Sequence, residues 1–158
     1  LARISDLSSD LDIALEIDED AATSRLAISS LDPLVLAVDG GALEDYKDPR
    51  RLGQLETSIA VTRLLLEYVD RQNPAFGAPP LDTETTQGHR QAWDVKLYGR
   101  GGRIGLRIHK PRVLYNFRNR HGFSDKADRV FEQLWAADDL SWSRIVELSD
   151  QAIDAVIT

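Results

Sequence analysis

The side chains best able to bind a ligand lie in one short basic segment. Residues 118–124 contain two arginines, a histidine and a serine that precedes an expected helix. Guanidinium groups and the free backbone N–H groups of a helix N-terminus both bind anions. The sequence therefore predicts an anion-binding site, and its candidate ligand-binding residues are Arg112, Arg118, Arg120, His121 and Ser124.

This site lies within a longer basic region. Between Arg90 and Arg120 there are nine basic residues and one acidic residue, so the region carries +8 and the rest of the chain −15. Where the basic side chains share a sheet face with carboxylates, we expect them to be neutralised across strands. For the basic side chains of residues 112–123 two interpretations stay open. They form ion pairs with the chain's own carboxylates, such as Asp125 or Asp128, or they bind an anionic partner.

Motifs for catalysis or metal binding are missing from the sequence. There is no cysteine, and no phosphate-binding loop, zinc-protease HExxH motif or GxSxG nucleophile motif is present. Asp39-Gly40-Gly41 follows an apolar run, but Asp-Gly is also common in tight turns, which we favour here. The sequence thus predicts no catalytic residue, no metal ligand and no cofactor.

Two kinds of sequence pattern predict strands: alternation of apolar and polar residues, and a short continuous apolar run. Strict alternation over residues 10–20 predicts a strand with one buried face, and residues 25–29 are expected to pair with it as a hairpin. Residues 34–38 form a short apolar run that predicts another strand. Alternation over 93–98 and 103–109, on either side of Gly99-Arg100-Gly101-Gly102, predicts a second hairpin.

Three helices complete the expected fold. Apolar spacing of three and four residues predicts a helix over 48–72 that packs Leu55, Ile59, Leu66 and Val69 on the sheet. Further helices are expected after Ser124, to residue 137, and after Ser141, with residues 74–89 as a surface loop. The predicted fold is a single α+β domain over 1–158: two layers, with antiparallel hairpins forming a sheet and three helices packed on one face.

Composition and charge limit the function. The chain has 158 residues, 42% of them hydrophobic, and a net charge of −7. Its longest apolar stretch, residues 34–38, is too short to cross a membrane. We expect a soluble, cytoplasmic, non-enzymatic binding domain that recognises an anionic ligand, such as a phosphate-bearing molecule or an acidic protein segment, through residues 112–123. Nucleic acid is a partner that we do not favour.

Two alternatives remain. One is a small hydrolase or transferase that uses Asp39, Asp94 and a histidine. The other is a structural homodimer in which acidic and basic surfaces meet.

Overall fold

The computed structural model describes residues 11–21, 23–82 and 84–153. It confirms the α+β class. The predicted sheet of antiparallel hairpins with three helices was wrong in its details, because the part of the chain described has one three-stranded mixed sheet and five α-helices. The chain divides into two compact units, residues 1–70 and 71–158. The single domain over 1–158 stays a prediction.

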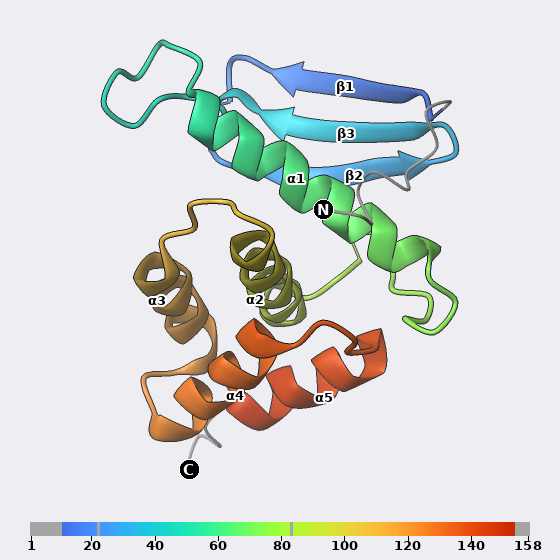
Figure 1. Ribbon diagram of the computed structural model, residues 1–158, viewed down its shortest axis with the longest axis vertical. Coiled ribbons are helices and arrows are strands. Elements are labelled where there is room, and N and C mark those ends of the chain that lie inside the picture. Colours follow the sequence, from blue (N-terminus) through green and yellow to red (C-terminus); the bar gives the residue numbers. More distant parts are fainter. Residues whose placement is uncertain (1–10, 22, 83, 154–158) are drawn as a thin grey trace. The chain divides into compact units, whose positions relative to one another are not determined.

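The first unit contains a mixed sheet. Strands β1 (Ile13–Asp18), β2 (Leu26–Leu31) and β3 (Leu34–Asp39) lie in the order β1-β3-β2, with β1 parallel and β2 antiparallel to β3 (Figure 1). The strands expected over 10–20 and 34–38 are therefore confirmed, although residue 10 lies outside the described residues. The buried face expected for the first strand was wrong, because Ile13, Leu15 and Ile17 of β1 are 44%, 47% and 45% exposed.

The pairing predicted for residues 25–29 was wrong. β2 pairs with β3, and β1 occupies the opposite edge of the sheet. The two residues between β2 and β3, Asp32 and Pro33, make a short antiparallel connection. Alternation identifies a strand and which residues share a side of it, but it does not identify the neighbouring strand.

Helix α1 (Gln54–Gln72) covers the sheet on one side. It follows a short 3-10 helix, η1 (Gly40–Ala42). The core of this unit consists of buried residues from β2, β3, the segment after η1, and α1: Ile28, Leu34, Leu36, Val38, Leu43, Ala60, Leu64 and Tyr68.

The start and the packing face predicted for α1 were partly wrong. Asp48 and Pro49 lie in a turn closed by backbone hydrogen bonds between residues 45, 48 and 51, so the helix begins six residues later than predicted. Ala60, Leu64 and Tyr68 make the stripe in the core, whereas Leu55 is 41% exposed. α1 is apolar on more than one side, so its composition did not single out the face that meets the sheet.

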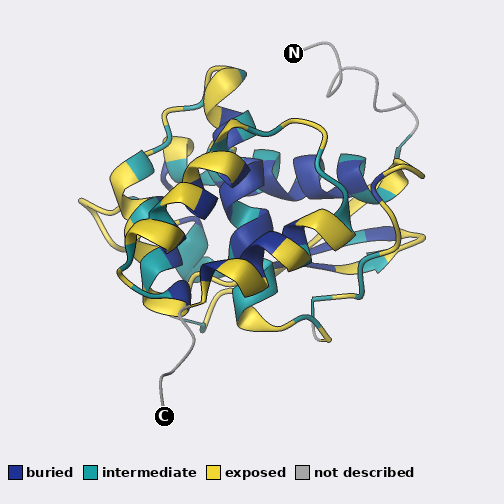
Figure 2. Cartoon of the chain, turned by 90° about the horizontal axis from the view of Figure 1, so that it is seen from below, coloured by how far each residue is buried: buried dark blue, intermediate teal, exposed yellow. Residues whose placement is uncertain are grey.

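The second unit is helical. It contains α2 (Gln87–Arg103), α3 (Lys110–His121), α4 (Asp125–Ala136) and α5 (Trp142–Ala152). Helix α2 contacts each of the other three. These helices bury residues on their inner sides and expose residues on their outer sides (Figure 2).

The hairpin predicted over 93–109 was wrong, because residues 87–103 form α2. Thr86 caps this helix by accepting a hydrogen bond from the backbone N–H of His89. Gly99 lies within the helix, where a Cβ atom would overlap the carbonyl oxygen of Trp135 in α4. Glycine is therefore needed here for close helix packing rather than for a turn.

Residues 112–121 belong to helix α3, which was not expected from the sequence. The helix ends at His121, and Gly122 follows with a φ of 104°. The other two helices of this unit confirm the prediction. Ser124 and Ser141 accept hydrogen bonds from the backbone N–H groups of Ala127 and Arg144, as N-caps do. Helix α4 ends at residue 136, one residue before the predicted end.

The long connection between α1 and α2 is anchored by charge and by aromatic packing. Asp82, 10% exposed, pairs with Arg71 at 3.7 Å and with Arg90. Both guanidinium groups lie over the ring of Trp93, at 5.0 and 5.6 Å from its centroid. Phe76 packs on Trp93 with ring centroids 5.1 Å apart.

No helix in the described part of the chain is long and apolar enough to cross a membrane.

We expect Leu64→Ala to lower the free energy of unfolding by about 2–5 kcal/mol, because it leaves a cavity in the core of the first unit. Leu55→Ala removes the same atoms from an exposed position and should change stability by less than about 0.5 kcal/mol. Chemical denaturation measures both. Equal losses would show that the packing face of α1 is misassigned.

A second prediction concerns the anchored connection. Asp82→Ala leaves two arginines without this carboxylate in a poorly solvated site, so it should destabilise the protein by about 3–5 kcal/mol. The matched control is Asp138→Ala, which breaks the exposed pair with Arg103 and should cost less than about 1 kcal/mol. Thermal unfolding of both variants tests the difference, and comparable shifts would contradict it.

Candidate partner-binding surface

Helix α3 has one buried side and one exposed side. Val113, Phe117 and His121, spaced by four residues, are buried. The opposite side is exposed and forms what we call the α3 face: Arg112, Tyr115, Asn116, Asn119, Arg120 and Phe123, the last of these just beyond the helix. The face carries two cations, two aromatic rings and two amides, and no acidic side chain.

Local sequence fixes where α3 begins. The Nδ1 atom of His109 accepts a hydrogen bond from the backbone N–H of Arg112, and Pro111 occupies the first turn. Proline suits this position because the first turn has no intrahelical partner for its N–H. His109, which the predicted hairpin placed on a strand, is thus the N-cap of the helix that presents the face.

Arg118 is engaged by a carboxylate of the chain itself. Its Nε and Nη2 atoms donate to the two carboxylate oxygens of Asp128, at 2.8 and 2.6 Å. This paired hydrogen bond raises the pKa of Arg118 and lowers the pKa of Asp128. For this arginine the structure shows the pairing alternative that the sequence left open.

The start of α4 is likewise occupied by the chain's own groups. The Oγ atom of Ser124 accepts a hydrogen bond from the N–H of Ala127, and Asp125 and Asp128 lie in the first turn. An incoming anion would meet two carboxylates there as well as the positive end of the helix dipole.

His121 is buried within the second unit, with 1% of its surface exposed. Its Nδ1 lies 3.1 Å from the carbonyl oxygen of Phe117, and its Nε2 lies 2.8 Å from Oγ of Ser149. Because a carbonyl only accepts, Nδ1 carries the proton and Nε2 accepts from the serine hydroxyl. Burial lowers the pKa of His121.

A serine that donates to a histidine is the arrangement that activates a nucleophile. Here, however, Ser149 is also 1% exposed, so a substrate does not reach its hydroxyl in this structure. The pair acts as a satisfied buried hydrogen bond, and the ring of His121 stacks on Phe117 with centroids 3.9 Å apart.

At least four of the nine basic residues of the region form ion pairs within the chain, although not in the way the sequence suggested. Arg103 pairs with Asp138 at 2.8 Å, and Lys110 pairs with Glu132 at 2.8 Å. Arg90 pairs with Asp82 and Asp94. The expected neutralisation across a charged sheet face was wrong, because these basic residues lie on helices and their connections rather than on strands.

Three arginines of the basic region differ from the rest. Arg107, Arg112 and Arg120 are exposed and form no ion pair with any residue that the structure describes. Two of these three lie on the α3 face. Of the five candidate residues from the sequence, Arg112 and Arg120 therefore share one solvent-facing surface, whereas Arg118, His121 and Ser124 have partners within the chain.

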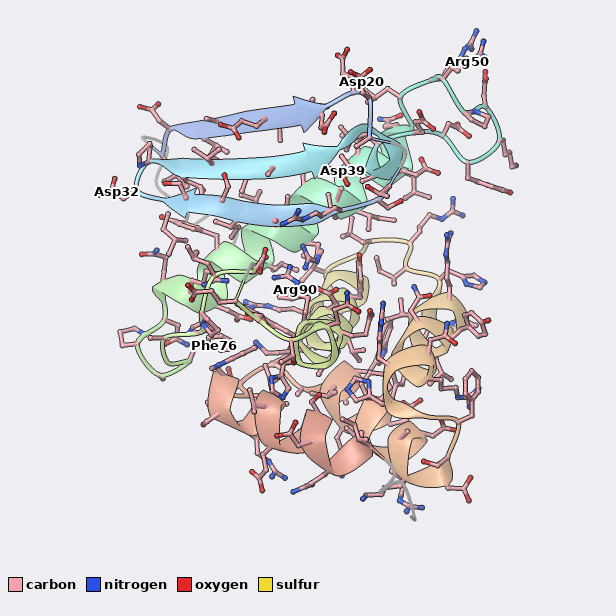
Figure 3. All side chains as sticks on the ribbon, turned by 180° about the vertical axis from the view of Figure 1, so that it is seen from behind. Asp20, Asp32, Asp39, Arg50, Phe76 and Arg90 are labelled. Carbon is pink, nitrogen blue, oxygen red and sulfur yellow. The ribbon has the colours of Figure 1, made fainter. Side chains whose placement is uncertain are left out.

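The residues of the alternative enzymatic interpretation lie in different units. Asp39, at the end of β3 (Figure 3), accepts hydrogen bonds from the hydroxyl of Thr23 and the backbone N–H of Arg25. Asp94 pairs with Arg90 at 3.4 Å. His89 lies 2.7 Å from Asp150. Within the described ranges, no three histidine, aspartate or glutamate side chains are grouped so as to hold a metal ion.

Comparisons with known proteins add no assignment. No family model matches the chain, and searches of curated proteins and of solved structures gave no match either.

Sequence reasoning missed that residues 112–123 have a helical face. The signal is visible in the spacing of Val113, Phe117 and His121, which repeats every four residues as one side of a helix does. It was obscured because histidine was counted as a ligand-binding residue rather than as part of the buried side.

The buried histidine makes stability depend on pH. Since the folded pKa of His121 is depressed, its contribution to stability is complete above the unfolded value of about 6.5 and is lost as the pH falls through the folded pKa. The free energy of unfolding should therefore decrease as the pH is lowered from about 7.5 to about 5. In the His121→Gln variant this decrease should be smaller. An unaltered slope in His121→Gln would contradict the assignment.

Proposed function

We propose that this chain is a binding domain rather than an enzyme, and that its α3 face recognises an anionic partner. The class of partner that we favour is an acidic protein segment. The observation that carries the proposal is the α3 face itself, which combines two arginines without a carboxylate partner among the described residues, two exposed aromatic rings and no acidic side chain.

The position of Arg112 supports a role beyond folding. It lies in the first turn of α3, where the positive end of the helix dipole disfavours a cation, and no acidic residue in that turn compensates. Arg120, in the last turn, is favoured by the dipole and so carries less weight. A cation at a position that costs stability is better explained by an external partner than by the helix.

The aromatic side chains of the face support the same interpretation. Tyr115 is 58% exposed and Phe123 is 66% exposed, and their rings meet edge to face with centroids 6.1 Å apart. The guanidinium group of Arg118 lies 5.9 Å from the ring centre of Phe123. Tyrosine, phenylalanine and arginine are enriched in protein–protein interfaces, and the two aromatic side chains bury large areas while ordering few torsions.

The net charge of the chain favours a short acidic segment over a long anionic polymer. The whole chain carries −7, whereas the α3 face carries two arginines without a carboxylate partner among the described residues. A nucleic acid extending beyond α3 would therefore meet a chain of net negative charge, whereas a short segment fits on α3 alone.

To test this proposal, a glutamate-rich peptide with leucines at helical spacing is titrated into the protein by calorimetry. Arg112→Ala and Arg120→Ala should each weaken binding by about 1.5–3 kcal/mol, the value of a hydrogen bond to a charged group. The matched control is Arg129→Ala, which removes the same charge from an exposed position on α4 and should leave binding within about 0.5 kcal/mol.

Inorganic phosphate and a single-stranded oligonucleotide are titrated in parallel. Stronger binding of either one, lost in Arg112→Ala, would reassign the partner class while keeping the surface. Binding that all three variants retain, or no binding of any probe, would contradict the proposal. Sedimentation of the protein alone tests the homodimer alternative, which requires association that Arg112→Ala weakens.

A further inference from the structure

Strand β1 has an open edge. In the order β1-β3-β2 it pairs with β3 along one side only, and no described residue pairs with its other side. All six of its residues are exposed. An edge strand of this kind presents unpaired backbone N–H and C=O groups to any extended chain that approaches it.

The apolar side of β1 continues the apolar side of β3, but α1 does not cover it. In the parallel register, Ile13 lies beside Leu34, Leu15 beside Leu36, and Ile17 beside Val38. The β3 residues are at most 2% exposed beneath α1, but Ile13, Leu15 and Ile17 are 44%, 47% and 45% exposed. Figure 1 shows α1 on the β3 and β2 side of the sheet, with β1 at the far edge.

The other side of β1 holds Ala14 and two acidic residues, and no basic residue. Glu16 and Asp18 alternate with the apolar residues, and Glu19 and Asp20 follow at the tip of the strand (Figure 3). From residue 4 to residue 24 the sequence holds seven acidic side chains and no basic one. No described residue forms an ion pair with Glu16 or Asp18.

We propose that the β1 edge, residues 13–18, binds an extended segment of a partner protein in which apolar and basic side chains alternate. Its backbone adds a fourth strand beside β1. Its apolar side chains cover Ile13, Leu15 and Ile17, and its basic side chains meet Glu16 and Asp18. This surface is independent of the α3 face, since it lies in the other unit and has the opposite charge.

Two simpler explanations fit less well. Acidic residues on an edge strand protect it from aggregation, which accounts for Glu16 and Asp18 but not for three bare aliphatic side chains on the same strand. A second copy of the chain could pair through β1, but antiparallel self-pairing would bring the acidic residues of both copies together. Charge complementarity therefore selects a basic partner.

The test uses a synthetic peptide of alternating valine and lysine. Because the six residues of β1 span about 20 Å, a peptide of about eight residues covers the strand. Fluorescence anisotropy measures binding, and amide hydrogen exchange measures protection of β1. We expect binding that weakens with salt and slower exchange of the β1 amides that point away from β3.

Variants separate the contributions. Leu15→Gln removes the apolar contact, and the double variant Glu16→Gln with Asp18→Asn removes the charge without touching the core. Each should weaken binding about tenfold or more, equivalent to about 1.4 kcal/mol. The matched control is Leu81→Gln, which changes a leucine of similar exposure, 40%, outside the sheet and should bind as the unaltered protein does.

Several results would overturn the proposal. They are no binding of the peptide, equal binding of a peptide that alternates valine and glutamate, or binding without protection of β1. Self-association of the protein alone that Leu15→Gln abolishes would assign the edge to a second copy instead. Loss of peptide binding in the charge variant, with the fold intact by thermal unfolding, supports the proposal even if Leu15→Gln unfolds.

Discussion

The burial of Phe117 and His121 within the helical unit decides which side of α3 meets solvent. The two rings stack, and the imidazole is held at both nitrogens, by the carbonyl oxygen of Phe117 and by the hydroxyl of Ser149. A polar ring can be buried in this way because each of its hydrogen-bonding atoms has a partner. With that side fixed, helical geometry requires Arg112, Tyr115, Asn116 and Arg120 to face outward.

Pairing within the fold separates structural cations from those available to a partner. Arg103 donates to the carbonyl oxygens of Trp135 and Ala137 near the end of α4 as well as to Asp138, so it helps to complete that helix. Arg90 anchors the connection that precedes α2. What remains is a small exposed set rather than a broad basic surface, and for that reason the favoured partner is a short acidic segment.

The two compact units carry surfaces of opposite charge built on different elements. A helix presents side chains to a partner while its own backbone hydrogen bonds are satisfied, so the α3 face depends on side-chain chemistry alone. An edge strand also offers its backbone, so the β1 edge selects first for an extended conformation and then for sequence. Both surfaces expose apolar side chains next to charge, a combination typical of sites where proteins meet.

The sequence by itself determined the features that local interactions control. Alternation identified β1, and Ser124 and Ser141 identified the starts of two helices, because strand pleating and N-capping involve residues that are neighbours in the chain. The sequence also indicated that residues 112–123 were chemically unusual, although it did not reveal their helix. Alternation failed for α2 because this helix contacts three others and buries Trp93, Val95, Lys96 and Leu97 on several sides, so no single apolar stripe appears.

Only the tertiary structure decided the pairings that join distant residues. These include the placement of β3 between β1 and β2, the close approach of Gly99 to Trp135, and the ion pair between Arg118 and Asp128. The sequence shows how many arginines and carboxylates the chain has, but it does not show which of them form ion pairs. Which of them meet depends on how the helices pack, since a guanidinium group and a carboxylate ten or more positions apart approach each other only once the fold has formed.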